Sequence, residues 1–155
     1  ILVDAAKHKG TSVVEVLQNC VIFSDGIHKN VTDKEWRKER TIMLKHGEKM
    51  LFGNDNEKGL VLDGWNIKAV IIGQDGYTID DVLVHDSNSE DNTLHMKLGL
   101  MSPENGLPLA LGVIRNVNRL VYDQEVNRLV NEAQAKSTVH TLREYLMTKD
   151  IWEVK

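Results

Sequence analysis

Short hydrophobic runs recur along this chain, and their spacing predicts helices and strands in alternation. Residues 1–9 place their apolar side chains on one side of a helix, which Gly10 can end in the left-handed conformation. The valine-rich run Thr11–Leu17 shows little alternation, which is typical of a strand buried on both faces of a sheet. A helix, a glycine and a buried strand in this order indicate an α/β layer.

The middle of the chain predicts one helix and then a small antiparallel sheet. Thr32 and Glu35 have the spacing of a capping box, which predicts a helix that reaches about Leu44. Asp63-Gly64 is typical of a hairpin turn between two strands. The expected strands are Lys49–Phe52, Leu60–Leu62 and Ile67–Ile72.

The last part of the chain predicts mainly helices around one further strand. Thr78 can cap a short helix that extends through His85, and helical spacing resumes before Pro103 stops it. The apolar run Leu107–Arg115 predicts a second α/β strand. Two further apolar helical faces follow, one over Val126–Ala133 and one over Val139–Leu146.

Composition limits the class of protein. A chain of 155 residues, 41% hydrophobic and 27% charged, predicts one soluble globular domain or part of a larger one. The net charge of -4 argues against nucleic-acid binding, and no apolar run approaches the roughly 20 residues that span a bilayer. The single cysteine excludes an internal disulfide and fits the cytoplasm. Because the first residue is Ile1, we expect the chain to be a piece of a longer protein.

Cys20 directly follows the predicted strand Thr11–Leu17, where α/β proteins gather ligands. Two interpretations of this thiol stay open on residue type alone. Free cysteine behaves as a small hydrophobic residue, and this inert role is the commoner one. A single cysteine cannot hold a metal ion or cluster, so if Cys20 is a ligand, the other ligands lie outside this chain.

The histidines form no recognisable catalytic or zinc motif. His85, Asp86 and His95 could be imagined as metal ligands, but their spacing matches no compact zinc site. His28 and Asp25 are close enough in sequence to be considered an acid/base pair, although nothing in the sequence brings them together. From its residues alone, the chain is a piece of an α/β protein without an assigned role.

The segment "HKGTSVVEVLQNCVIFSDG" (His8 to Gly26) resembles a known protein family. It resembles the C-terminal part of the β subunit of 2-oxoacid:ferredoxin oxidoreductases, especially the 2-oxoglutarate type. The resemblance spans essentially the whole chain in the same order. It continues through "VTDKEWRKER", "HGEKMLFG", "KGLVLDGWNIKAVIIGQDG", "DDVLVHD" and "LPLALGVIR", and ends on "DIWEVK".

The resemblance implies an enzyme that uses thiamine diphosphate and Mg²⁺ to decarboxylate a 2-oxoacid. A 4Fe-4S cluster then passes electrons to ferredoxin, and coenzyme A takes the acyl group. It also implies the C-terminal portion of a thiamine-diphosphate-binding fold. In this interpretation residues 1–30 end that domain, and residues 31–155 form an extension packed on it, with a small antiparallel β elaboration and C-terminal helices.

The resemblance assigns a role to Cys20. In this family the fourth cluster ligand follows a strand in a "Leu-Gln-(Pro/Asn)-Cys" context, which "VLQNC" matches. We expect Gln18 and Asn19 to belong to the turn that orients this thiol. The family's Cys-x-x-Cys pair, third cysteine and Gly-Asp-Gly motif are missing. We therefore expect the chain alone to bind neither the cluster nor thiamine diphosphate.

The intact enzyme would pair this β subunit with an α subunit, and the family defines its other partners as ferredoxin, the 2-oxoacid and coenzyme A. The charged helix after Thr32 and the hairpin around Asp63 are the expected subunit contacts. Two alternatives stay open. The chain could be a non-catalytic interaction module derived from the family, or the enzyme could act on pyruvate or a branched 2-oxoacid.

Overall fold

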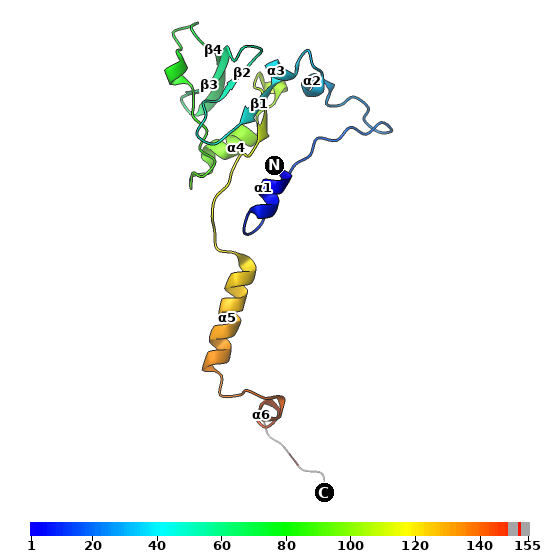
Figure 1. The fold of residues 1–155 in the computed structure, drawn as a ribbon, viewed down its shortest axis with the longest axis vertical. Helices are drawn as coiled ribbons and strands as arrows, with labels where there is room; N and C mark the ends of the chain where they lie inside the picture. The colour runs from blue at the N-terminus through cyan, green and yellow to red at the C-terminus, as the bar shows by residue number, and fades with distance from the viewer. Residues whose placement is uncertain (149–151, 153–155) are drawn as a thin grey trace. The chain divides into compact units, whose positions relative to one another are not determined.

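The computed structural model describes residues 1–148 and 152. It divides the chain into two compact units, one of residues 1–7 and 13–118 and the other of residues 8–12 and 119–155 (Figure 1). Among the described residues, no helix is both long and apolar enough to cross a membrane.

A three-stranded antiparallel sheet forms the predicted β elaboration, in the order β2-β3-β4. Its strands are β2 (Leu51–Phe52), β3 (Lys58–Asp63) and β4 (Asn66–Ile71). The predicted turn is confirmed, because Asp63 pairs with Asn66 and Gly64 has a φ of +59°. A left-handed residue at this position matches the twist of a two-residue hairpin.

The first unit also contains a pair of parallel strands, β1 (Thr41–Leu44) and β5 (Leu109–Gly112). Gly112 ends β5 with a φ of +101°, and a Cβ at this position would lie 2.5 Å from the carbonyl oxygen of Leu44. The close approach of the two backbones therefore requires glycine. The parallel pair and the surrounding helices agree with a mixed α/β class, and β5 confirms the strand predicted over Leu107–Arg115.

The helix predicted from Thr32 to Leu44 is wrong. The structure has two short helices, α2 (Lys29–Thr32) and α3 (Arg37–Arg40), and then strand β1. The Thr32 hydroxyl donates a hydrogen bond to the His28 carbonyl at 2.9 Å, so it ends a helix and does not cap a new one. In β1, the buried Ile42 and Leu44 flank the exposed Met43, which is the two-residue period of a strand.

One hydrophobic core joins both strand groups to α4 (Thr93–Gly99), a helix that the apolar spacing predicts correctly. Leu60 of β3 and Leu98 of α4 have no exposed surface. The 3₁₀ helices η1 (Ile79–Asp81) and η2 (Pro103–Asn105) lie on either side of α4 in the sequence. The buried members of the cluster are Ile42, Leu44, Met50, Phe52, Leu60, Leu98 and Met101.

The helix predicted from Thr78 through His85 is shorter than expected. The Asp81 carboxylate accepts the Thr78 backbone N–H at 2.7 Å and so caps η1. The chain then extends, because the Leu83 N–H donates to the Leu60 carbonyl at 2.9 Å and Val82 is buried. Tertiary pairing with β3 therefore overrides the local helical pattern.

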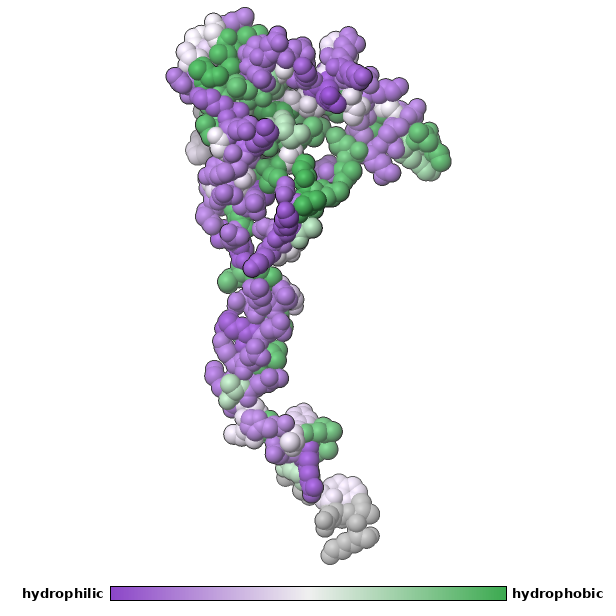
Figure 2. Space-filling view, in the orientation of Figure 1, coloured by the Kyte–Doolittle hydropathy of each residue, from purple (hydrophilic) through white to green (hydrophobic). Residues whose placement is uncertain are grey.

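The N-terminal helix is confirmed as α1 (Leu2–Lys7), but the strand predicted over Thr11–Leu17 is wrong for this chain. That run forms no strand and is exposed, with 92% of Val13 accessible to solvent. A strand exists only when its backbone groups pair with a neighbour, and the described residues supply none. Figure 2 shows the resulting hydrophobic surface in the segment between α1 and α2.

The second unit contains the two helices predicted for the end of the chain, α5 (Tyr122–Lys136) and α6 (Leu142–Leu146). Thr141 caps α6 by accepting the Glu144 N–H, and the Glu144 carboxylate accepts the Thr141 N–H in return. The final family motif, "DIWEVK", lies outside the described residues except for Trp152.

Candidate functional site

Cys20 lies in a closed loop that its neighbour Asn19 holds together. The Asn19 amide donates to the Asp25 carboxylate at 3.0 Å, and its oxygen accepts the Gly26 N–H at 2.8 Å. The Ser24 N–H donates to the Cys20 carbonyl at 2.8 Å and closes the loop from within. The sequence predicts that Asn19 belongs to the turn that orients the thiol, and these bonds join it to the far end of the loop at Asp25 and Gly26.

Backbone N–H groups of the loop influence the Cys20 thiol. The Phe23 N–H contributes most, followed by those of Ile22 and Ser24, and together they lower the pKa of the exposed Cys20 thiol. A lower pKa favours the thiolate, which is the form that binds metals. N–H donors to cysteine sulfur also tune the potential of iron–sulfur clusters. The donor set therefore fits one ligand of such a cluster.

Cys20 belongs to no group of metal-ligating side chains in the part of the chain that the structure describes. Among the described residues, no three histidine, cysteine or acidic side chains form a group that could hold a metal ion. Gln18 is exposed, and its side chain makes no hydrogen bond within residues 1–148. The loop thus presents a single thiol, and the other ligands of any cluster must come from other polypeptide.

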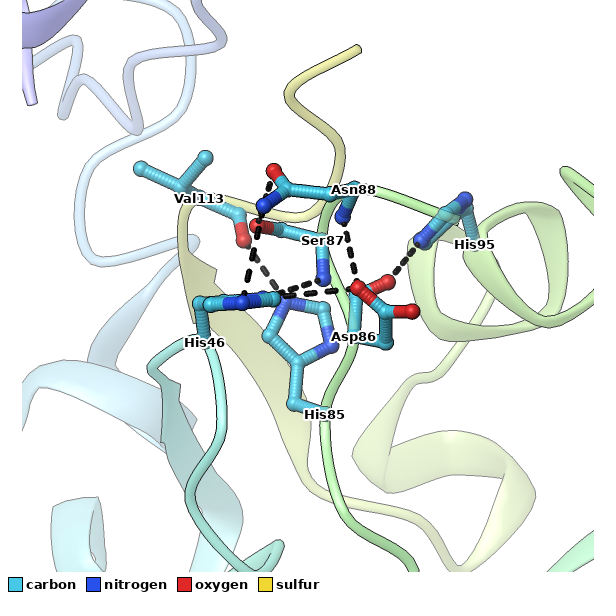
Figure 3. A network of polar contacts seen from close by, with 7 residues as sticks. All are labelled: His46, His85, Asp86, Ser87, Asn88, His95 and Val113. Carbon is cyan, nitrogen blue, oxygen red and sulfur yellow. Dashed lines mark hydrogen bonds and ion pairs between the residues drawn. The ribbon is translucent and has the colours of Figure 1, made fainter. Parts of the chain in front are cut away.

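The second polar group of the first unit surrounds the carboxyl ends of β1 and β5 (Figure 3). Nδ1 of His46 lies 3.4 Å from the Asp86 carboxylate and also 3.2 Å from the Ser87 backbone nitrogen, which donates to it. Nδ1 can donate a hydrogen bond to Asp86 or accept one from Ser87, but not both at once. The members of this cluster are His46, His85, Asp86, Ser87, Asn88, His95 and Val113.

The two buried histidines of the cluster, His85 and His95, form hydrogen bonds to backbone carbonyls of other segments. Nε2 of His85 lies 2.8 Å from the Val113 carbonyl oxygen, and Nε2 of His95 lies 2.7 Å from the Asp86 carbonyl oxygen. Because a carbonyl only accepts, each Nε2 carries a proton in these contacts. Both Nδ1 atoms are buried without a hydrogen-bond partner in the described chain. The two side chains are therefore suited to a structural role.

Burial is the main reason that the pKa of His85 is lowered. The Val113 carbonyl opposes this shift, and the neighbouring imidazoles of His95 and His46 reinforce it. The rings of His85 and His95 meet edge to face, with centroids 6.2 Å apart. His85, Asp86 and His95 do not converge on a common metal position among the described residues.

The imagined pair of His28 and Asp25 does not form among the described residues. The Asp25 carboxylate accepts from Asn19, and His28 precedes α2, where its carbonyl accepts the Val31 and Thr32 N–H groups. The sequence did not indicate that His46 joins this cluster. The segment through Leu44 was predicted as a helix, whereas it ends in strand β1, and His46 follows that strand. Ile42, Met43 and Leu44 are all apolar, so the two-residue period of this strand appears only in the burial of the folded chain and the sequence carries no clear signal for it.

Comparisons with known proteins identify a relative. No protein-family model matches the chain, and no solved structure matches it. The 2-oxoglutarate oxidoreductase subunit KorB of Mycobacterium tuberculosis is 33% identical over 156 aligned residues. The match covers 99% of this chain and 41% of that subunit.

The similarity agrees with the resemblance carried by "VLQNC" and the motifs that follow it. The chain spans about two fifths of the length of its relative, so the comparison concerns one portion of that subunit. The chain is homologous to a portion of the KorB subunit of 2-oxoglutarate oxidoreductase.

Proposed function

We propose that this chain is the C-terminal part of the β subunit of a 2-oxoacid:ferredoxin oxidoreductase. The intact enzyme oxidatively decarboxylates a 2-oxoacid, with 2-oxoglutarate the favoured substrate. The carboxylate leaves as CO₂, coenzyme A takes the acyl group, and oxidised ferredoxin accepts the electrons. The observation that carries this proposal is the 33% identity to KorB over 99% of the chain.

In the intact enzyme, thiamine diphosphate with Mg²⁺ supplies the carbanion chemistry and a 4Fe-4S cluster carries the electrons. Cys20 is the part of that machinery present in this chain. The loop from Asn19 to Gly26 orients the thiol, and its backbone N–H groups stabilise the thiolate. The remaining cluster ligands and the residues that bind thiamine diphosphate lie outside this chain.

Residues 1–30 belong, on this proposal, to the end of the thiamine-diphosphate-binding domain. The exposed valines of Thr11–Leu17 support it, because such a run becomes stable as a strand when neighbouring strands pair with its edges and helices cover both of its faces. Residues 31–155 form the extension packed on that domain. A cytoplasmic location of the whole enzyme is part of this proposal.

Contact with the α subunit is proposed for the segment after Thr32 and for the hairpin around Asp63. Trp65 supports the second position, because it lies at the hairpin tip with 81% of its surface exposed. A large exposed aromatic side chain is a frequent anchor in protein interfaces. Ferredoxin, the 2-oxoacid and coenzyme A are the other proposed partners.

Substrate-dependent reduction of methyl viologen tests the reaction. The full-length protein that contains this chain, purified with its α subunit without oxygen, should reduce the dye when both 2-oxoglutarate and coenzyme A are present. Faster reduction with pyruvate or a branched 2-oxoacid would reassign the substrate within the same reaction. Absence of reduction with every 2-oxoacid, from protein that contains iron and thiamine diphosphate, would overturn the proposed activity.

A non-catalytic interaction module is the second candidate, favoured by the presence of a single cysteine. It would keep the family's extension without binding either cofactor. Iron and thiamine content of the full-length protein separates the two candidates. A colourless protein without either cofactor that still binds its α subunit would support the module and exclude the enzyme.

A further inference from the structure

Three aspartates of this chain directly precede a glycine, in the pairs Asp25-Gly26, Asp63-Gly64 and Asp75-Gly76. An aspartate in this position can react with its own backbone, because the nitrogen of the next residue can reach the side-chain carboxyl carbon Cγ. Glycine favours the reaction, since it has no Cβ to obstruct the approach. The three pairs are chemically alike, so the contacts of the folded chain decide which of them reacts.

Both reacting groups are free in the pair Asp75-Gly76. The pair lies in the loop between β4 and η1, and both residues are exposed. Two backbone hydrogen bonds close this loop around the pair, from the Tyr77 N–H to the Gln74 carbonyl at 3.0 Å and from the Gly73 N–H to the Tyr77 carbonyl at 2.8 Å. Among the described residues, neither the Asp75 carboxylate nor the Gly76 N–H forms a hydrogen bond or an ion pair.

The backbone of this loop also has room to change conformation. Asp75 has a φ of +52°, and Asn56 is the only other non-glycine residue in the described chain with a positive φ. L-residues seldom adopt this conformation, so the loop holds Asp75 in a less favourable state than an extended or helical one. Gly76 has a φ of +80°, and no atom lies within 4 Å of the position that a Cβ would take. No packing contact there opposes a movement of the Gly76 nitrogen towards the Asp75 side chain.

The other two Asp-Gly pairs are held by hydrogen bonds. The Asp25 carboxylate accepts the Asn19 amide at 3.0 Å, and the Gly26 N–H donates to the Asn19 side-chain oxygen at 2.8 Å. One side chain therefore engages both groups that would have to react. Asp63 is the last residue of β3 and pairs with Asn66 of β4, which fixes the backbone at the start of that turn.

Asn105-Gly106 is the one Asn-Gly pair of the sequence and can form the same ring by losing ammonia. Its N–H group is engaged, because Gly106 donates to the Pro103 carbonyl at 3.1 Å in η2. Loss of ammonia also changes the mass of the final product, whereas isomerisation of an aspartate does not. The two reactions are therefore separable in one experiment.

We propose that Asp75 is a site of spontaneous isomerisation to isoaspartate. The Gly76 nitrogen attacks Cγ of the protonated Asp75 carboxyl group, a new N–C bond closes a succinimide ring, and the carboxyl hydroxyl leaves with the amide proton as water. Water then opens the ring. Opening at Cγ restores aspartate, whereas opening at the backbone carbonyl leaves the chain running through Cγ, which is isoaspartate. The product is a substrate for carboxyl methyltransferases that recognise isoaspartate, and the inference does not depend on the reaction proposed for the intact enzyme.

Peptide mapping of aged protein tests the proposal. The full-length protein that contains this chain is incubated at physiological pH and temperature, and electron-transfer fragmentation in the mass spectrometer distinguishes isoaspartate from aspartate. We expect isoaspartate to accumulate at Asp75 and to be about tenfold less abundant at Asp25, where two hydrogen bonds must break first. Asp75→Glu should abolish the signal at this position, because the longer side chain closes a larger ring more slowly. Asp75→Asn should form isoaspartate faster than the wild type.

Asn19→Ala is the reciprocal variant, because it releases both Asp25 and Gly26. It should raise isoaspartate at Asp25 about tenfold and leave the amount at Asp75 unchanged. In urea, where the contacts of the folded chain are lost, the three Asp-Gly pairs should react at similar rates. Absence of isoaspartate at Asp75 from the folded protein would overturn the proposal. The same ratio of isoaspartate at Asp75 and Asp25 with and without urea would overturn it as well, since the fold would then not select the site.

Discussion

Residues 41–112 and residues 11–27 both contain many apolar side chains, yet only the first region buries them. Leu60 and Leu98 are fully buried between strands and α4, whereas 88% of Phe23 and 92% of Val13 are exposed. The first region supplies its own pairing strands. The second has local hydrogen bonds around Cys20 but no strand beside it in the described chain. A stable structure of residues 11–27 therefore requires both local hydrogen bonds and cover for its hydrophobic side chains. In this chain only the local hydrogen bonds are present.

Leu60→Ala should break the first region and give the largest effect. It removes a fully buried side chain from the core, so we expect a loss of about 2–5 kcal/mol in the free energy of unfolding. Urea titration followed by circular dichroism measures it. The matched control is Val13→Ala, for which we expect a change within about 0.5 kcal/mol because Val13 is exposed in this chain. Similar losses for both variants would erase the contrast between the regions.

Gly112→Ala should destabilise the parallel pair without removing any buried side chain. The new Cβ would lie 2.5 Å from the Leu44 carbonyl oxygen, and the φ of +101° is unfavourable for alanine. Backbone strain of this kind costs about 1–3 kcal/mol. Thermal unfolding of Gly106→Ala is the comparison, since Gly106 also has a positive φ but no atom near a new Cβ. A smaller loss in Gly112→Ala than in Gly106→Ala would contradict the steric argument.

Acid should weaken the first region through His85. Its pKa is lower in the folded chain than in the unfolded chain, mainly because of burial, so the unfolded state takes up the proton first as the pH falls. The stabilisation from neutral His85 is present above its ordinary pKa of about 6.5 and is lost as the pH falls from there towards the folded pKa. Urea titrations between neutral and mildly acidic pH should show this loss, and His85→Gln should reduce the slope. If the free energy of unfolding of His85→Gln falls with pH as steeply as that of the wild type, His85 is not the cause of the acid destabilisation.

Asn19→Ala should change the Cys20 loop locally, with little effect on the free energy of unfolding of the first region. The substitution removes the bonds to Asp25 and Gly26, so the backbone N–H groups no longer hold their positions around the sulfur. The thiol pKa should therefore rise towards its ordinary value. Thiolate absorbance against pH measures it, and Gln18→Ala should leave the pKa unchanged. A rise in Gln18→Ala alone would contradict the role of Asn19.

Sequence reasoning was most successful where local pattern and tertiary contacts agree. The hairpin at Asp63-Gly64, helix α4 and strand β5 were predicted because turn chemistry and apolar spacing specify them locally. The helix predicted through Leu44 is wrong because Thr32 and Glu35 have the spacing of a capping box, whereas the strand period of Ile42, Met43 and Leu44 lies in their burial and not in their residue types. A parallel partner more than sixty positions later, β5, decides the strand, and local pattern cannot reveal such a partner.

The candidate site was predictable only in part. "VLQNC" identified Cys20 and placed Asn19 in its turn, since both depend on adjacent residues. The histidine cluster depends on the course of the chain between elements, which local pattern does not reveal. The strand predicted before Cys20 depends on neighbouring strands that this chain does not supply.

The iron content of the full-length protein tests the central claim about Cys20 most directly. Protein purified without oxygen should contain a 4Fe-4S cluster with its visible absorption, and Cys20→Ala should lose most of the iron and acid-labile sulfide while thiamine diphosphate stays bound. Asn127→Ala, an exposed position on α5, purified in parallel, should keep the wild-type iron content. A Cys20→Ala protein with the wild-type iron content and spectrum would show that this thiol is not a cluster ligand.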